Sequence, residues 1–128
     1  MNYVIDTSAW VEYFQGSDKG RVVKEIVENK KNKIHTNLVN YAELISFFHR
    51  NNKDFERVKQ LVYGLTAFFY FYYDFAEEAG EIHAELKRTK RNISLADAFV
   101  IATAKKLKAK IVTADYDFDN LDNVVFLK

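Results

Sequence analysis

The chain contains no cysteine and no proline, and only four glycines in 128 residues. The lack of cysteine excludes disulfides, thiolate nucleophiles and zinc–thiolate sites. Because no disulfide requires an oxidising compartment and no N-terminal signal peptide is evident, the cytoplasm is the expected location. With so little proline and glycine the chain has little material for long loops, and we expect short connections between regular elements.

The chain also has no large excess of positive or negative charge, and it has no long apolar run. Its formal net charge is +1, whereas a protein that coats nucleic acid with positive charge would be far more basic. The longest apolar run, 65–73, is too short to span a bilayer, so no membrane association is expected. Eleven Phe and eight Tyr supply apolar material for a core. The length predicts a single domain over residues 1–128.

Short apolar runs alternate with stretches of helical periodicity along the chain. The expected strands are 3–5, 33–36, 67–73, 111–113 and 124–127, and the expected helices are 9–14, 18–30, 37–50, 54–62, 74–90 and 94–107. The aromatic block 67–73 has high β-propensity and no helical period, which predicts a strand buried on both faces. Asp74 and Glu77 match a capping box at the start of the following helix. Strands separated by helices predict an α/β fold with a parallel sheet between two helical layers.

Two acidic residues directly follow expected strands. Asp6 comes after the first strand, and Asp115 comes just after the strand that ends at Thr113. Ligands of open parallel sheets bind beyond the carboxyl ends of the strands, so both residues are candidates for a site. The alternative is that each aspartate is an ordinary turn or helix-capping residue.

Two further acids lie in expected helices with apolar neighbours on the same face. Glu43 has Val39 four residues before it and Phe47 four residues after it. Asp97 has Val100 and Ile101 three and four residues after it. A carboxylate in such a place is brought to the edge of the core, where an uncompensated charge is costly. Asp97 has a second interpretation, because the sequence from Ser94 to Asp97 also matches a capping box.

The four acids lie in blocks that together resemble the signature of PIN domains, and most closely that of the VapC toxins of toxin–antitoxin pairs. The blocks are Asp6-Thr7-Ser8, Tyr41-Ala42-Glu43-Leu44, the segment Ala96 to Ala104, and the segment Thr113 to Phe118. They occur in the expected order and span the chain from Met1 to Lys128. The resemblance implies a PIN-like three-layer α/β/α sandwich with a central parallel sheet.

The resemblance also implies roles for individual residues. The acids required in the family match Asp6, Glu43 and Asp97, and a fourth acidic position matches Asp115, with Asp117 as the alternative. Hydroxyl groups that in the family order water or the neighbouring acids match Thr7 and Thr113, for which ordinary capping and turn hydrogen bonds are the alternative.

Close carboxylates raise one another's pKa unless a cation neutralises them, and oxygen ligands select a hard ion, Mg²⁺ or Mn²⁺. The implied activity is that of a metal-dependent endoribonuclease that hydrolyses RNA phosphodiester bonds. The implied partners are the RNA substrate, a VapB-like antitoxin and a second copy of the chain in a homodimer. Two alternatives remain: a PIN nuclease of RNA processing or turnover that has no antitoxin, and a non-catalytic PIN scaffold.

Overall fold

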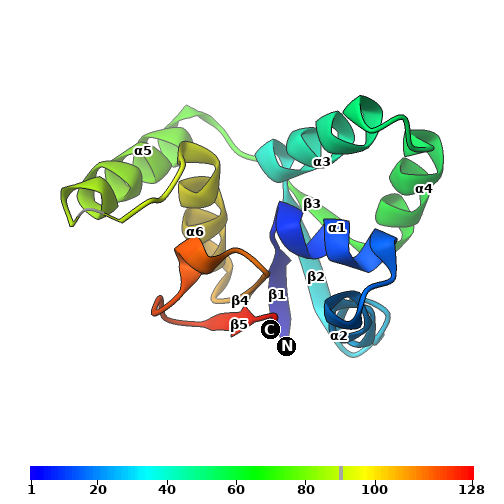
Figure 1. Ribbon diagram of the computed structural model, residues 1–128. Coiled ribbons are helices and arrows are strands. Elements are labelled where there is room, and N and C mark those ends of the chain that lie inside the picture. Colours follow the sequence, from blue (N-terminus) through cyan, green and yellow to red (C-terminus); the bar gives the residue numbers. More distant parts are fainter. Residues whose placement is uncertain (90) are drawn as a thin grey trace.

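A five-stranded sheet separates two groups of helices in the computed structural model, which describes residues 1–89 and 91–128 (Figure 1). The strands are β1 (Asn2–Ile5), β2 (Lys33–Asn37), β3 (Ala67–Phe69), β4 (Lys110–Thr113) and β5 (Val124–Phe126). Their order is β3-β2-β1-β4-β5, and each neighbouring pair is parallel. The predicted α/β fold with a central parallel sheet is therefore confirmed. The first strand of the chain lies in the middle of this sheet.

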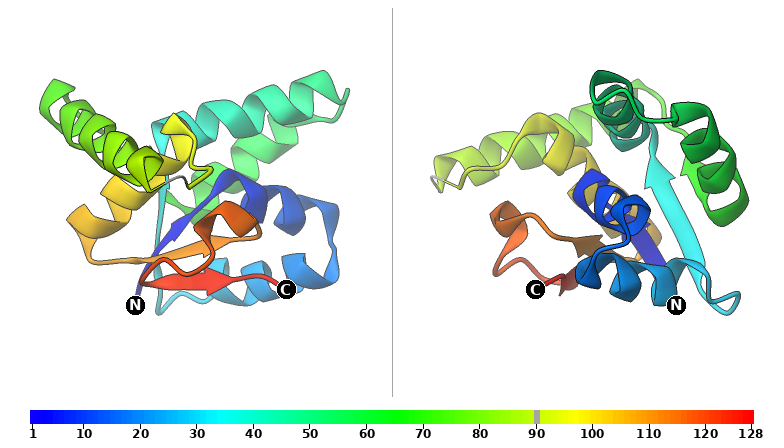
Figure 2. Two further views of the ribbon diagram at one scale, coloured as in Figure 1. Left: turned by 60° about the vertical axis from the view of Figure 1, so that its left-hand side comes forward. Right: turned by 45° about the vertical axis from the view of Figure 1, so that its right-hand side comes forward.

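The helices form one layer on each face of the sheet (Figures 1 and 2). One layer contains α1 (Thr7–Gln15), α2 (Asp18–Val27), α3 (Leu38–Arg50) and α4 (Phe55–Leu65). The other contains α5 (Tyr73–Arg88) and α6 (Leu95–Leu107), and a short 3₁₀ helix, η1 (Tyr116–Phe118), connects β4 to β5. No helix within the described ranges has both the length and the apolar content needed to cross a membrane.

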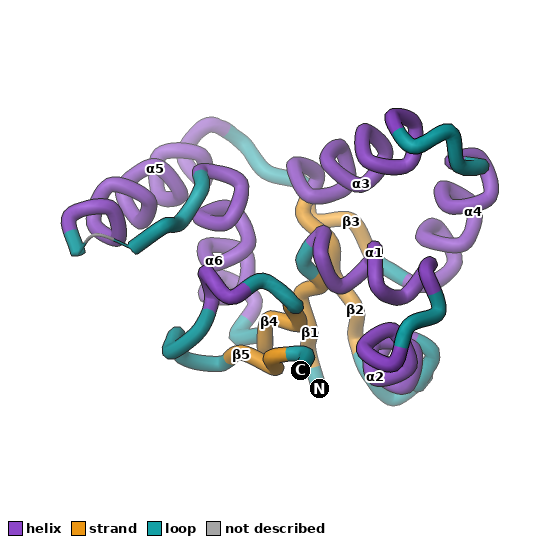
Figure 3. The backbone as a smooth tube through the Cα atoms, viewed as in Figure 1, coloured by secondary structure: helices purple, strands orange, loops and turns teal. Residues whose placement is uncertain are grey.

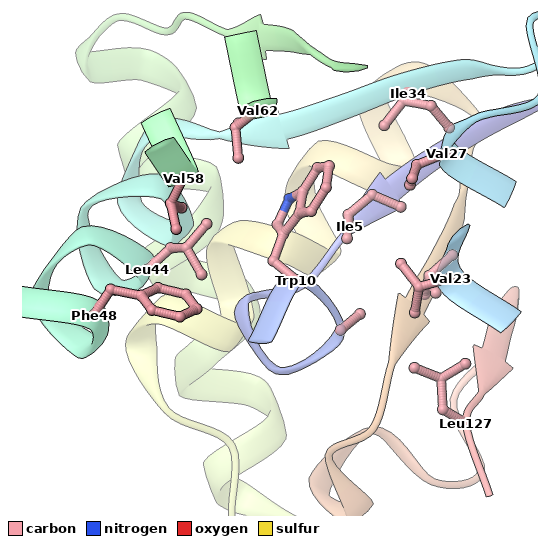
Figure 4. Packing of buried hydrophobic residues seen from close by; sticks show 12 residues of the cluster. Ile5, Trp10, Val23, Val27, Ile34, Leu44, Phe48, Val58, Val62 and Leu127 are labelled. Atoms are coloured by element: carbon pink, nitrogen blue, oxygen red, sulfur yellow. The ribbon is translucent and has the colours of Figure 1, made fainter. Parts of the chain in front are cut away.

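Alternation along β1 provides both layers with a core. Ile5 faces the α1–α4 side, where it packs in a cluster with the fully buried Trp10 (Figure 4). Val4 faces the opposite side and packs with Val100 of α6. Successive side chains of a strand point to opposite faces, so a single four-residue strand anchors both helical layers. The Trp10 indole N–H donates to Thr36 Oγ1 of β2 at 3.1 Å, which satisfies its polar group inside the core.

The aromatic block departs from the prediction of one long buried strand. β3 covers only Ala67–Phe69 and forms an edge of the sheet, and the chain then leaves the sheet for α5. The prediction was wrong because the block has two kinds of side chain. Phe71 packs on Phe99 of α6 with ring centroids 5.2 Å apart, while Tyr70 and Tyr72 are 75% and 84% exposed.

The predicted capping box at Asp74 and Glu77 is also absent. Helix α5 begins at Tyr73, with Tyr72 as its N-cap and no side-chain cap hydrogen bond. Asp74 therefore lies inside the first turn, where its Oδ1 accepts from the Phe75 amide at 2.9 Å. The helix starts early enough to direct Phe75 into the cluster with Ala79 and Ala102, so burial rather than the cap determines where it begins.

Candidate metal centre

The carboxyl ends of β1 and β4, which are neighbours in the sheet, lie side by side. Asp6 follows β1 directly, and its backbone N–H donates to the carbonyl of Val112 in β4 at 3.0 Å. Thr113 is the last residue of β4, and Asp115 is the N-cap of η1. In Figure 3 the segment after β4 runs from the sheet toward α6, which supplies Asp97. Neighbouring parallel strands thus bring together residues from the two ends of the chain.

Asp6 is a buried carboxylate held by two hydroxyl groups. Its side chain is enclosed, with the residue only 4% exposed. Its Oδ2 accepts from Ser8 Oγ and from Thr113 Oγ1, both at 2.8 Å. Burial raises the pKa of Asp6 to about 7, although both hydrogen bonds act in the opposite direction, and the charge of Asp97 adds to the increase. Among the residues that the structure describes, none gives ionised Asp6 a positive partner that would compensate its desolvation.

Asp97 forms the predicted capping box and is also part of the acidic site. Its Oδ2 accepts from the Ser94 amide at 3.1 Å, and its own amide donates to Ser94 Oγ at 3.1 Å. The pKa of Asp97 is raised, mainly by burial and further by the charges of Asp115 and Asp117. The two interpretations of Asp97 do not exclude each other, because the cap orients the carboxylate at the start of α6.

Three of the candidate acids form a close group. Asp97, Asp115 and Asp117 each offer a carboxylate oxygen, and these oxygens lie within 4.8 Å of one another. The η1 turn sets the last two, because Asp115 Oδ1 accepts from the Asp117 amide at 2.9 Å and the Asp115 amide donates to Thr113 Oγ1 at 3.0 Å. Both Asp115 and Asp117 belong to the group, so each offers a carboxylate oxygen for the fourth acidic position.

Glu43 lies at the solvent-exposed surface of α3. Its Oε1 accepts from Thr7 Oγ1 at 2.8 Å and from Asn40 Nδ2 at 3.2 Å. Thr7 directly follows Asp6, so this hydrogen bond ties Glu43 to the segment that carries the buried acid. Within the described residues, the group that lies inside 4.8 Å includes neither Glu43 nor Asp6.

Sequence reasoning missed two residues that support the acids. Ser8 donates to Asp6 and accepts from the amide of Ala114, so it connects the ends of β1 and β4. Asn40 is fully buried and holds both Thr7 and Glu43. Its position three residues before Glu43, on the same helix face, is a signal that was present in the sequence. Ser8 resembled an ordinary helix-start residue.

The donor set fits a hard divalent cation. All the candidate ligands are oxygen atoms, and uncompensated carboxylates at this spacing repel one another. Asn40, which donates to Glu43, has a buried Oδ1 with no hydrogen-bond partner among the described residues. With neither cysteine in the chain nor histidine in this group, the group offers a cation oxygen ligands and no sulfur or nitrogen ligands.

Solved structures with this fold include several toxin–antitoxin proteins. A toxin–antitoxin complex from Klebsiella pneumoniae matches with a TM-score of 0.76 at 20% identity, covering 98% of each chain. VapBC2 from Rickettsia felis, bound to a promoter DNA fragment, matches with a TM-score of 0.73 at 21% identity over 98% of this chain and 97% of that one. VapC20 from Mycobacterium tuberculosis, described as a sarcin–ricin loop cleaving toxin, matches with a TM-score of 0.69 at 19% identity over 91% of each chain.

These identities are low, and the likeness to the solved structures shows a shared fold. A comparison with curated protein sequences finds no match. The family model of the PIN domain, in contrast, matches residues 3–124, which include every acid described above. The chain therefore belongs to the PIN domain family.

Proposed function

We propose that this protein is a metal-dependent endoribonuclease of the VapC toxin type, which hydrolyses RNA phosphodiester bonds. The observation that carries the proposal is the close group of Asp97, Asp115 and Asp117 beside the buried Asp6. Membership of the PIN family and the toxins among its structural neighbours support a nuclease of this type.

In this proposal the four acids Asp6, Glu43, Asp97 and Asp115, together with Asp117, hold Mg²⁺ or Mn²⁺. A bound divalent ion activates water for attack at phosphorus and stabilises the leaving oxygen. The chain's own hydroxyl groups orient the acids: Ser8 and Thr113 fix Asp6, and Thr7 fixes Glu43. Thr7 and Asn40 both bind Oε1 of Glu43, so Oε2 remains available for a ligand as far as the described residues are concerned.

The test is RNA cleavage by the purified protein. We expect cleavage in millimolar Mn²⁺ or Mg²⁺ and none after EDTA is added, because every candidate ligand is a carboxylate. Cleavage that persists undiminished in EDTA would refute the mechanism. A protein that binds Mn²⁺ and RNA but cleaves no RNA would favour the non-catalytic scaffold.

A pair of variants separates the metal-binding role of Asp97 from its role as a cap. Asp97→Asn keeps an acceptor oxygen for the Ser94 amide but removes the charge, so we expect activity to fall by orders of magnitude while the fold persists. Ser94→Ala removes the cap hydroxyl and should cost about 1 kcal/mol of stability while most activity remains. Thermal melts and cleavage rates of both variants decide between the roles. An active Asp97→Asn protein would assign Asp97 to the scaffold alone.

The proposal includes two protein partners. One is a VapB-like antitoxin, which the toxin–antitoxin complexes among the structural neighbours support. The other is a second copy of the chain in a homodimer. A nuclease of RNA turnover without an antitoxin would have the same acidic site, so the partner distinguishes the two functions.

A further inference from the structure

Arg91 connects the segment that leads into α6 with the turn that carries Asp115 and Asp117. Its Nη2 donates to the backbone carbonyl of Asp117 at 3.0 Å and also to that of Asp119. The side-chain amide of the next residue, Asn92, donates to Asp117 Oδ1 at 3.4 Å. Asp97 lies on the first turn of α6, a few residues further along the chain. The hydrogen bonds of Arg91 and Asn92 thus join the two parts of the chain that supply the close acidic group.

The acidic group needs such a connection when it holds no cation. Asp97 faces Asp115 and Asp117, whose charges disfavour its ionised form, and the same repulsion pushes η1 away from α6. The 3₁₀ helix that bears Asp117 is only three residues long, so its own backbone offers little resistance. Arg91 binds backbone carbonyl groups of this turn and not its carboxylates. The carboxylate oxygens are therefore left available for a ligand while the turn is held.

The chemistry of arginine suits this task. A guanidinium group is planar and always charged, and one of its nitrogens can donate to two carbonyl oxygens at the same time. Its positive charge also offsets part of the negative charge nearby. A lysine at this position would keep the charge but lose the fixed fork of donors.

We propose that Arg91 is a positioning residue that keeps Asp115 and Asp117 beside Asp97 before the divalent cation binds. This inference rests on the proposed function, because it assigns Arg91 to the metal site of that function. Arg91 is not a ligand in this scheme, and it acts by holding the turn that bears two of the ligands.

The first test is Mn²⁺ binding to the full chain, measured by titration calorimetry. Arg91→Met retains the apolar stem and removes the guanidinium, and we expect its Kd for Mn²⁺ to rise about 10-fold or more, as for other residues that support metal ligands. Arg91→Lys should lie between this variant and the wild type. The control is Arg88→Met, which removes the same charge from an exposed residue in the last turn of α5 and should leave the Kd unchanged.

The second test needs no metal. Hydrogen exchange in EDTA reports on the turn itself, because the amides of Phe118 and Asp119 donate to Asp115 and Tyr116 within it. We expect Arg91→Met to increase the exchange of these two amides while the amides of β1 and β4 stay protected. A purely structural role would instead weaken protection throughout the protein.

The outcomes separate this inference from the function on which it rests. If the wild type binds Mn²⁺ and Arg91→Met binds it equally well, the positioning role is overturned and the proposed function stands. If the wild type binds no Mn²⁺, the proposed function fails, and the role of Arg91 in metal binding fails with it. Weaker Mn²⁺ binding in Arg91→Met, together with local loss of protection in η1, supports the positioning role.

Discussion

Asp6 links the stability of this protein to pH. Burial raises its pKa to about 7, whereas a carboxyl group of this kind in an unfolded chain has a pKa of about 3.9. Between these two values the folded state binds more protons than the unfolded state, so stability falls as the pH rises through this window. In metal-free protein the loss of unfolding free energy that Asp6 causes is complete above pH 7, and it amounts to at most about 4 kcal/mol.

The variant Asp6→Asn checks this expectation. We expect urea unfolding in EDTA to show wild-type stability falling from pH 5 to pH 8 by more than that of the variant, which lacks the Asp6 carboxyl group. The raised pKa of Asp97 and the lowered pKa of His35 remain in both proteins. At pH 8 the variant should be the more stable protein. Equal pH dependence of the two proteins would mean that Asp6 is not the group that titrates.

At the scale of single residues, the sequence offers a reason to choose the candidate acids but little reason to choose the residues that bind them. Asp6 and Asp115 could be found because they follow strands of a parallel sheet, and that rule depends only on topology. Ser8 could not be assigned in the same way, because it bonds to Ala114, which is distant in sequence. For Asn40 the spacing to Glu43 was visible in the sequence, but the hydrogen bond to Thr7, 33 residues away, was not. Arg91 could not be assigned from the sequence either, because its contact with Asp117 spans 26 residues.

At the scale of elements, the junction between α1 and α2 brings Gly20 of α2 close to the backbone of α1. A Cβ atom built on this residue would lie 2.1 Å from the carbonyl oxygen of Glu12, which is backbone and cannot move alone. We therefore expect Gly20→Ala to destabilise the protein by about 1–3 kcal/mol. Gly16, in contrast, is required for its positive φ of 67° at the end of α1.

The control for this prediction is Gly80→Ala in α5. The described residues place no atom within 4 Å of the added Cβ, and Gly80 is in a helix interior, so the change should stabilise the protein by about 0.5–1 kcal/mol. Chemical denaturation of both variants measures the difference. If both substitutions stabilise the protein, or both destabilise it, the close approach of α1 and α2 does not determine the stability change at Gly20.

Most elements could be predicted because periodicity and capping residues agreed with the tertiary structure. For α6, Ser94 and Asp97 form the expected capping box and the apolar face packs on the sheet, so the predicted range 94–107 was nearly correct. The prediction of one long strand for the aromatic block was wrong because β-propensity does not distinguish Phe from Tyr. Phe71 is partly buried and Tyr72 is exposed, and this difference, which ends β3 early, arises from packing against α6.

At the scale of the whole molecule, the proposed toxin function predicts a phenotype. Expression of the wild-type chain should arrest growth, and co-expression of a small neighbouring gene product should restore it. Asp97→Asn, which retains the capping acceptor, should be harmless at the same protein level. Growth curves with immunoblots of protein abundance measure this. If the wild type is toxic but no neighbouring product binds it in a pull-down, the nuclease without an antitoxin becomes the better description.

The position of β1 in the middle of the sheet has a consequence for biosynthesis. Asp6 is synthesised 107 residues before Thr113, which donates to its carboxylate. Until β4 is made and pairs with β1, the chain has neither the centre of its sheet nor the turn that bears Asp115 and Asp117. A nascent chain, or a fragment that stops before β4, therefore carries no assembled acidic site, and under the proposed function it would cleave no RNA.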